Sequence, residues 1–156
     1  MPAAIPALPP YAHLDQAAVQ CVAEASARYE VPELLMHAIL MKENGRNGKY
    51  SVNKNGTYDL GLAQINTSWL TYFAKYGIRP EYIMDDPCVN ISISAYILKY
   101  NWLRQNHDWF KAVMAYNIGN GNWTPSRYAI GYKYASDVAR YWWGFYRYVE
   151  NTTPPR

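Results

Sequence analysis

A mainly α fold in a single globular domain is what this sequence predicts, on three observations. Six segments carry apolar residues at helical spacing, and strand-like alternation is scarce. The 156 residues are half apolar and 17% charged, which is enough to bury one hydrophobic core. We expect the domain to occupy residues 14–150, with at most a small irregular β element. Residues 1–13, which include four prolines, and residues 151–156 read as tails.

The first two helices have clear start and stop signals. Asp15 is a good N-cap for a helix that ends near Tyr29. Pro32 suits the first turn of a second helix, which runs to about Glu43 and is expected to end at Gly45. Ala18, Cys21, Val22, Ala25 and Tyr29 lie on one stripe of the first helix.

Residues 45–57 are rich in glycine and asparagine and predict a loop, folded at most into short irregular strands. Residues 53–59 faintly resemble a calcium loop. They lack its leading carboxylate and its closing glutamate, so we exclude calcium. A third helix is expected over Thr67–Tyr76, burying Trp69, Leu70 and Phe73.

The second half of the chain is expected to be helical as well. Asp86 can cap and Pro87 can start a helix that reaches Trp102, and Asp108 can cap the next helix, which extends through Tyr116. A glycine-rich turn at 119–121 and a last helix over about Ser136–Val149 complete the prediction.

The two cysteines, Cys21 and Cys88, are too far apart in sequence for a CxxC motif. They are either two buried thiols or a disulfide formed in an oxidising compartment. Each lies on the apolar stripe of a helix, so a bridge would join the first helix to the fourth, and we favour the disulfide. Such a bridge would stabilise the fold by roughly 4 kcal/mol in the chain-entropy model.

Charge and composition narrow the possible partners. The net charge of +3 is spread along the chain without a basic run, which argues against nucleic acid and is compatible with an anionic polymer such as a bacterial cell wall. Three scattered histidines give no metal site, and no cofactor is expected. No apolar run approaches the ~20 residues of a membrane span. The first residues do not have the pattern of a signal peptide.

Sixteen tyrosines and six tryptophans against three phenylalanines are open to two interpretations. They fill the core and rim of a small helical domain, or they line a sugar-binding cleft, where flat rings stack on sugar faces.

Glu43 is the candidate general acid. It follows Ile39 by four residues and Met36 by seven, so all three lie on one helix face. Partial burial and the negative end of the helix dipole would both raise the pKa of Glu43. The alternative is an ordinary surface glutamate at a frayed helix end. Four side chains that suit sugar recognition lie beside glycines or at helix ends: Gln64, Asn66, Tyr116 and Asn117.

Three ordered blocks resemble the signatures of bacterial lytic transglycosylases: Glu43-Asn44, residues 61–66 (GLAQIN) and residues 115–121 (AYNIGNG). The similarity is greatest to the small, specialised members that accompany conjugation, secretion and pilus systems. The similarity extends to the segment that leads into the second block and to the start of the following helix. The matching residues are Asn53, Asn55, Gly56, Asp59 and Gly61 in the first case and Pro87, Cys88, Asn90 and Ile91 in the second. The chain departs from the usual pattern at Asn44, where serine is common, and at Ala63, where methionine is common.

The resemblance implies a lysozyme-like fold, a periplasmic location and a peptidoglycan substrate for a monomeric enzyme. Glu43 would protonate the bond between N-acetylmuramic acid and N-acetylglucosamine, and a 1,6-anhydro product would form without water. We expect Asp59 to play a structural role. Hydrolysis as in goose-type lysozymes, or a non-catalytic peptidoglycan-binding module, are the alternatives. The expected substrate-binding residues are Asn53, Gln64, Asn66, Tyr116 and Asn117.

Overall fold

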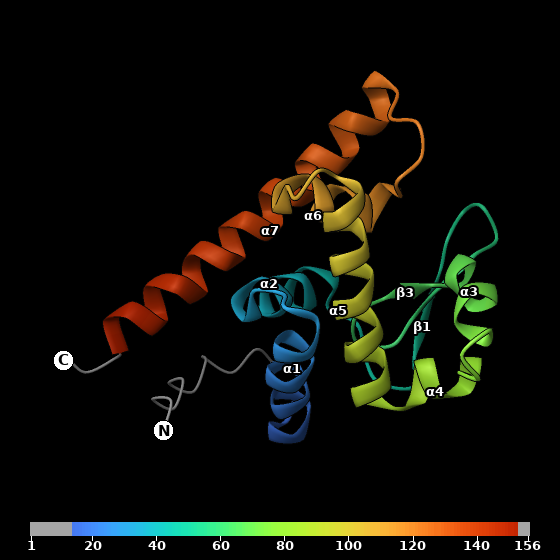
Figure 1. The fold of residues 1–156 in the computed structure, drawn as a ribbon, viewed down its shortest axis with the longest axis horizontal. Helices are drawn as coiled ribbons and strands as arrows, with labels where there is room; N and C mark the ends of the chain where they lie inside the picture. The colour runs from blue at the N-terminus through green and yellow to red at the C-terminus, as the bar shows by residue number, and fades with distance from the viewer. Residues whose placement is uncertain (1–13, 153–156) are drawn as a thin grey trace.

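The computed structural model describes residues 14–152, and the two ends of the chain that were predicted to be tails lie outside or at the edge of this range. The fold is mainly helical with a small sheet, as expected (Figure 1). The elements in order are α1 (Gln16–Tyr29), α2 (Glu33–Glu43), β1 (Tyr50–Val52), β2 (Tyr58–Leu60), β3 (Ile65–Asn66), the 3-10 helix η1 (Thr67–Trp69), α3 (Leu70–Ala74), α4 (Pro80–Asp85), α5 (Pro87–Arg104), α6 (Trp109–Ile118) and α7 (Pro125–Thr152).

Helix α2 lies at the centre of the fold. All six residues from Leu35 to Leu40 are buried, because α1 covers one side of the helix and α7 another. A helix that is apolar all round has this position in a globular protein. The residues that end α2 are therefore fixed by packing on several sides.

Helices α1 and α5 pack side by side and are joined by the disulfide between Cys21 and Cys88, which confirms the favoured interpretation of the two cysteines. Their Cα atoms are 5.3 Å apart. The caps are also as predicted, since Asp15 accepts a hydrogen bond from the Ala18 amide and Asp86 from the amides of Cys88 and Val89.

The sheet and the short helices form a smaller lobe on the other side of α5 from α1 and α2 (Figure 1). The three strands are antiparallel in the order β1-β2-β3, with Ser51 opposite Asp59 and Asp59 opposite Asn66. Only β1 lies in residues 45–57, where a loop with at most short irregular strands was expected, and β2 and β3 follow it. Asp59 is the central residue of this register.

The last helix is longer than predicted. It starts at Pro125 rather than near Ser136 and extends to Thr152, two residues beyond the predicted domain end. Its first three turns contain few aliphatic residues and carry Gly131, so they show little helical periodicity. In the folded chain Gly131 packs directly against Ile118 and Met114 of α6, where a Cβ would lie 2.7 Å from Ile118 Cδ1. Its small size allows α6 and α7 to approach closely.

Two smaller expectations were wrong, and one short helix was not predicted. Asn44, with φ 52°, ends α2 in the left-handed conformation in place of Gly45. The predicted third helix is divided into η1 and α3, with Trp69 and Leu70 only partly buried. Helix α4 was not predicted, although Pro80 is at its first position.

Between residues 14 and 152 no helix has both the length and the apolar character needed to cross a membrane.

Candidate active site

Glu43 is the last residue of α2. It lines a cleft of about 560 Å³ between the long helices and the smaller lobe that contains the sheet. Met36 and Ile39, on the same helix face, are fully buried and hold this end of α2 in place. Glu43 itself is partly buried. The cleft is lined by Glu43, Asn53, Asn55, Thr57, Asp59, Gln64, Ile65, Asn66, Ser68, Trp69, Ile97, Ala115, Tyr116, Asn117, Ile118, Gly119, Asn120 and Arg127.

Gly45 sets the approach of α2 to the turn between β2 and β3. A Cβ at this position would lie 2.0 Å from the Gly61 carbonyl oxygen and 2.6 Å from that of Leu62. Any side chain would push these backbones apart. The glycine thus brings the end of α2 against the turn that carries Gln64.

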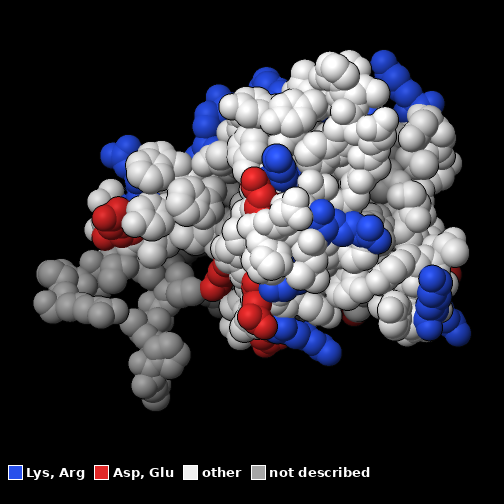
Figure 2. Space-filling model, turned by 45° about the horizontal axis from the view of Figure 1, so that its top comes forward, with Lys and Arg blue, Asp and Glu red and all other residues white. Residues whose placement is uncertain are grey.

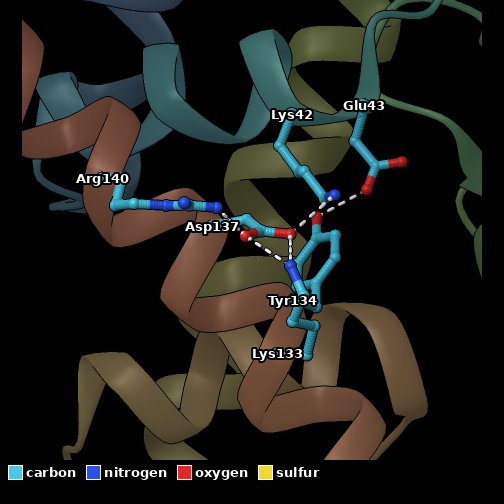
Figure 3. Close-up of polar contacts among 6 residues, drawn as sticks. All are labelled: Lys42, Glu43, Lys133, Tyr134, Asp137 and Arg140. Carbon is cyan, nitrogen blue, oxygen red and sulfur yellow. Dashed lines mark hydrogen bonds and ion pairs between the residues drawn. The ribbon is translucent and has the colours of Figure 1, made fainter.

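One carboxyl oxygen of Glu43 accepts a hydrogen bond from Tyr134 of α7, at 2.5 Å (Figure 3). The other oxygen points away from this cluster. Burial raises the pKa of Glu43 to about 7, and the charge of Asp59 acts in the same direction. The Tyr134 hydrogen bond and the nearby charge of Lys42 oppose this rise. Glu43 can therefore carry a proton near neutral pH, as a general acid must.

The opposite wall of the cleft is a network of amides around the Asp59 carboxylate and the Thr57 hydroxyl. The Asn66 amide donates to Asp59 Oδ1 at 2.9 Å and to Thr57 Oγ1 at 3.0 Å, and its oxygen caps η1 by accepting from the Ser68 amide. Asn53 donates to the same Thr57 hydroxyl at 3.1 Å. The Asp59 carboxylate is therefore held by an amide donor across the sheet.

Gln64 stands in the turn between β2 and β3 with φ 54°, a conformation that is uncommon for a residue with a side chain. Its amide nitrogen donates to the Gly61 carbonyl oxygen at 3.0 Å. The side chain is thus fixed on its own turn at the edge of the cleft. Positions of this kind are often found at functional sites.

Tyr116 and Asn117, near the end of α6, also line the cleft. The Tyr116 hydroxyl donates to the Ala63 carbonyl oxygen at 2.7 Å and is 3.1 Å from the Ser94 hydroxyl. Burial raises the pKa of Tyr116, so it stays protonated and keeps this donor role. Asn117 is exposed on the cleft surface.

Asn90 of α5 holds the turn between β2 and β3 in place. Its side chain is fully buried and makes three hydrogen bonds of 2.8 Å, accepting from the Ala63 amide and donating to the carbonyl oxygens of Leu60 and Ile83. A buried amide is stable only when its polar atoms are satisfied in this way. This side chain links α5, the sheet and α4.

The structure brings all six predicted catalytic and substrate-binding residues to one cleft. Sequence reasoning missed Tyr134, the partner of Glu43, because the last helix was predicted to begin near Ser136, two residues after Tyr134, whereas it begins at Pro125. Gly131, Tyr134, Ala135 and Val138 are all buried, and their spacing continues the helical pattern towards the N-terminus. Extending that pattern would have found Tyr134.

Within residues 14–152 no group of three or more His, Cys, Asp or Glu residues is arranged to hold a metal ion. On the face shown in Figure 2, Lys and Arg side chains lie in separate places rather than in one broad patch.

Comparison with known proteins places these residues in a family. The model of the "Transglycosylase SLT domain" matches residues 20–136. Protein IpgF of Shigella flexneri is 33% identical over 129 residues, covering 82% of this chain and 81% of its own length. Invasion protein IagB of Salmonella typhimurium is 30% identical over 135 residues, with 86% and 79% covered. X polypeptide of Escherichia coli is 35% identical over 132 residues, with 81% and 75% covered.

Proposed function

The chain belongs to the transglycosylase SLT domain family, and from that premise we propose that it is a peptidoglycan lytic transglycosylase acting on the bond from N-acetylmuramic acid to N-acetylglucosamine. The observation that carries the proposal is Glu43, a partly buried carboxyl group in a polar cleft with a pKa raised to about 7. A module that only binds glycan has no need of such a group.

The reaction needs one proton donor that later becomes a proton acceptor. Glu43 gives its proton to the glycosidic oxygen as the bond to C1 of N-acetylmuramic acid breaks. The substrate's N-acetyl oxygen supports the positive charge that develops at C1. The Glu43 carboxylate then takes the proton of the C6 hydroxyl while O6 bonds to C1, which gives the 1,6-anhydro sugar and regenerates the acid.

The remaining cleft residues suit a sugar polymer. Amides of Asn53, Gln64, Asn66 and Asn117 can exchange hydrogen bonds with hydroxyl and N-acetyl groups, and the partly buried Trp69 and Tyr116 offer ring faces. Asp59 is proposed to shape this wall rather than to react, since its carboxylate is engaged by Asn66.

The biological setting is part of the proposal. One relative is named an invasion protein, and cutting the wall locally would make room for a secretion, conjugation or pilus apparatus. The enzyme would then act in the periplasm, and the disulfide between Cys21 and Cys88 is compatible with that oxidising compartment.

Digestion of purified sacculi, followed by mass spectrometry of the released muropeptides, tests the reaction. The proposal expects 1,6-anhydro products from the wild-type chain and none from E43Q, which keeps the shape of Glu43 and removes the proton. Asp59 lines the same cleft and makes hydrolysis the second candidate, because hydrolytic glycosidases commonly use two carboxylates. Hydrolytic products are heavier by one water. Glycan binding without any cleavage would contradict both candidates.

A further inference from the structure

A cluster of charged side chains lies directly behind Glu43, outside the cleft (Figure 3). Its centre is Asp137 of α7, which is 8% exposed and faces three cations. Lys42 Nζ, from α2, lies 3.1 Å from Asp137 Oδ2, and Lys133 Nζ lies 2.9 Å from Asp137 Oδ1. Arg140 also bonds to Asp137. Lys133 and Lys42 hold the pKa of Asp137 well below its usual range.

The three cations differ in origin. Lys133 and Arg140 are on α7 itself, and their side chains are 74% and 76% exposed. Lys42 comes from α2, is 31% exposed and is the residue immediately before Glu43. Two adjacent residues of α2 therefore contact two residues one turn apart on α7: Glu43 contacts Tyr134 and Lys42 contacts Asp137.

This arrangement determines where the Lys42 charge lies. Both Lys42 and Glu43 point towards α7 in Figure 3, and the lysine nitrogen is 5.9 Å from the centre of the Tyr134 ring. The described residues show an ion pair from Lys42 to Asp137 and none from Lys42 to Glu43. A lysine has a long, flexible stem, so it follows its charge partner.

We propose that Asp137 is a positioning residue that holds the Lys42 ammonium group off the Glu43 carboxyl group, so that Glu43 keeps its proton at neutral pH. The inference rests on the proposed function, for which the proton on Glu43 is required. Without the Asp137 charge, Lys42 loses its ion-pair partner, and its charge already acts on the adjacent Glu43 carboxyl group. A direct ion pair would stabilise the carboxylate and remove the acid.

The other titratable groups that face Glu43 come from α7, β2 and α6. Tyr134 on α7 donates to it, Asp59 on β2 disfavours its ionisation, and Tyr116 on α6 is a neutral phenol. None of them changes in the variants below, so a shift in the titration of Glu43 reports on Lys42 and Asp137.

The test is a double-mutant cycle in which NMR measures the titration of the Glu43 side-chain carboxyl carbon. The chain has six glutamates, and the Glu43 signal is the one that disappears in E43Q. D137N should lower the pKa of Glu43 by about one pH unit or more, since an adjacent cation has an effect of that size. K42Q should raise it. The double variant D137N/K42Q should restore it to at least the wild-type value and should recover muropeptide release that D137N loses at neutral pH.

Lys133→Gln is the matched control, because it removes a cation from the same carboxylate on the exposed side and should leave the Glu43 titration in place. The proposal is overturned if D137N titrates like the wild type, or if the double variant titrates like D137N. A role limited to packing predicts lost activity in D137N without a pKa change and without rescue. The titration needs no substrate, so a chain without transglycosylase activity would refute the proposed function and leave this test readable.

Discussion

The two walls of the cleft are built on different principles. The wall formed by α2 and α7 carries charge behind it: Glu43 bonds to Tyr134, and Lys42 pairs with Asp137 one turn away. The wall formed by the sheet is a set of amides and a hydroxyl around one carboxylate, in which Asn66 donates to Asp59 and Thr57. The first wall controls one proton, and the second presents hydrogen-bonding groups to a polymer.

This difference leads to a division of kinetic roles. Changes on the helical wall should act on kcat and on the pH profile, because they alter a proton transfer. Changes on the sheet wall should act mainly on KM, because they alter contacts made equally to substrate and transition state. Variants on each wall can separate the two roles.

The largest effect is expected for E43Q. Glutamine fills the same space and cannot donate the proton, so kcat for release of anhydromuropeptides should fall about 10³-fold, within the usual range for a general acid. Quantitative chromatography of sacculus digests measures it. Glycan pull-down by the variant should match that of the wild type, and near wild-type turnover would show that the acid lies elsewhere.

A second effect concerns stability. The folded chain binds the Glu43 proton more tightly than the unfolded chain, because the pKa is raised from 4.5 to about 7. Stability from this group is therefore fully present below pH 4.5 and lost as pH rises through 7. Denaturant unfolding measures the free energy of unfolding of both proteins at pH 5 and pH 8. The value for E43Q minus that for the wild type should be on the order of 3 kcal/mol larger at pH 8 than at pH 5. An equal difference at both pH values would contradict the raised pKa.

Tyr134→Phe should have a smaller effect, on the order of tenfold in kcat. It removes the hydrogen bond that orients the Glu43 carboxyl group and favours its ionised form. The alkaline limb of the pH–rate profile should therefore move to higher pH. Tyr116→Phe is the comparison, since it removes a phenol from the same cleft that bonds to Ala63, and it should lower activity without moving that limb.

The smallest effect is expected for Asn66→Ala on the sheet wall. It releases Asp59, Thr57 and the cap of η1, each a contact worth on the order of 1 kcal/mol. KM should rise several-fold while the pH profile keeps its shape. Initial rates on soluble glycan chains across a range of pH separate the two effects. A displaced pH optimum would show that the walls are not independent.

Much of the helical framework could be predicted from the sequence because it depends on local signals. Asp15, Asp86 and Asp108 cap the helices they were expected to cap, and the disulfide follows from two apolar stripes. The spacing from Met36 and Ile39 made Glu43 a candidate, and the nearby sugar-binding side chains and the three family blocks favoured it over a surface glutamate.

What could not be predicted depends on contacts between distant residues. The partners of Glu43 and Lys42 are 91 and 95 residues away, and helical periodicity carries no information on which residues of two helices meet. The role of Gly45 was misread for the same reason. A glycine after a helix suggests a terminator, but here it is required by the close approach of Gly61 and Leu62.

The buried Asn90 side chain has a consequence for how the protein opens. It bonds at once to the β2–β3 turn and to the end of α4, while its backbone belongs to α5. The small lobe should therefore unfold together with α5 rather than peel away, and their slowest amides should exchange with solvent as one cooperative unit. In hydrogen-exchange experiments Asn90→Ala should split that unit, so that the sheet exchanges by local opening while α5 stays protected.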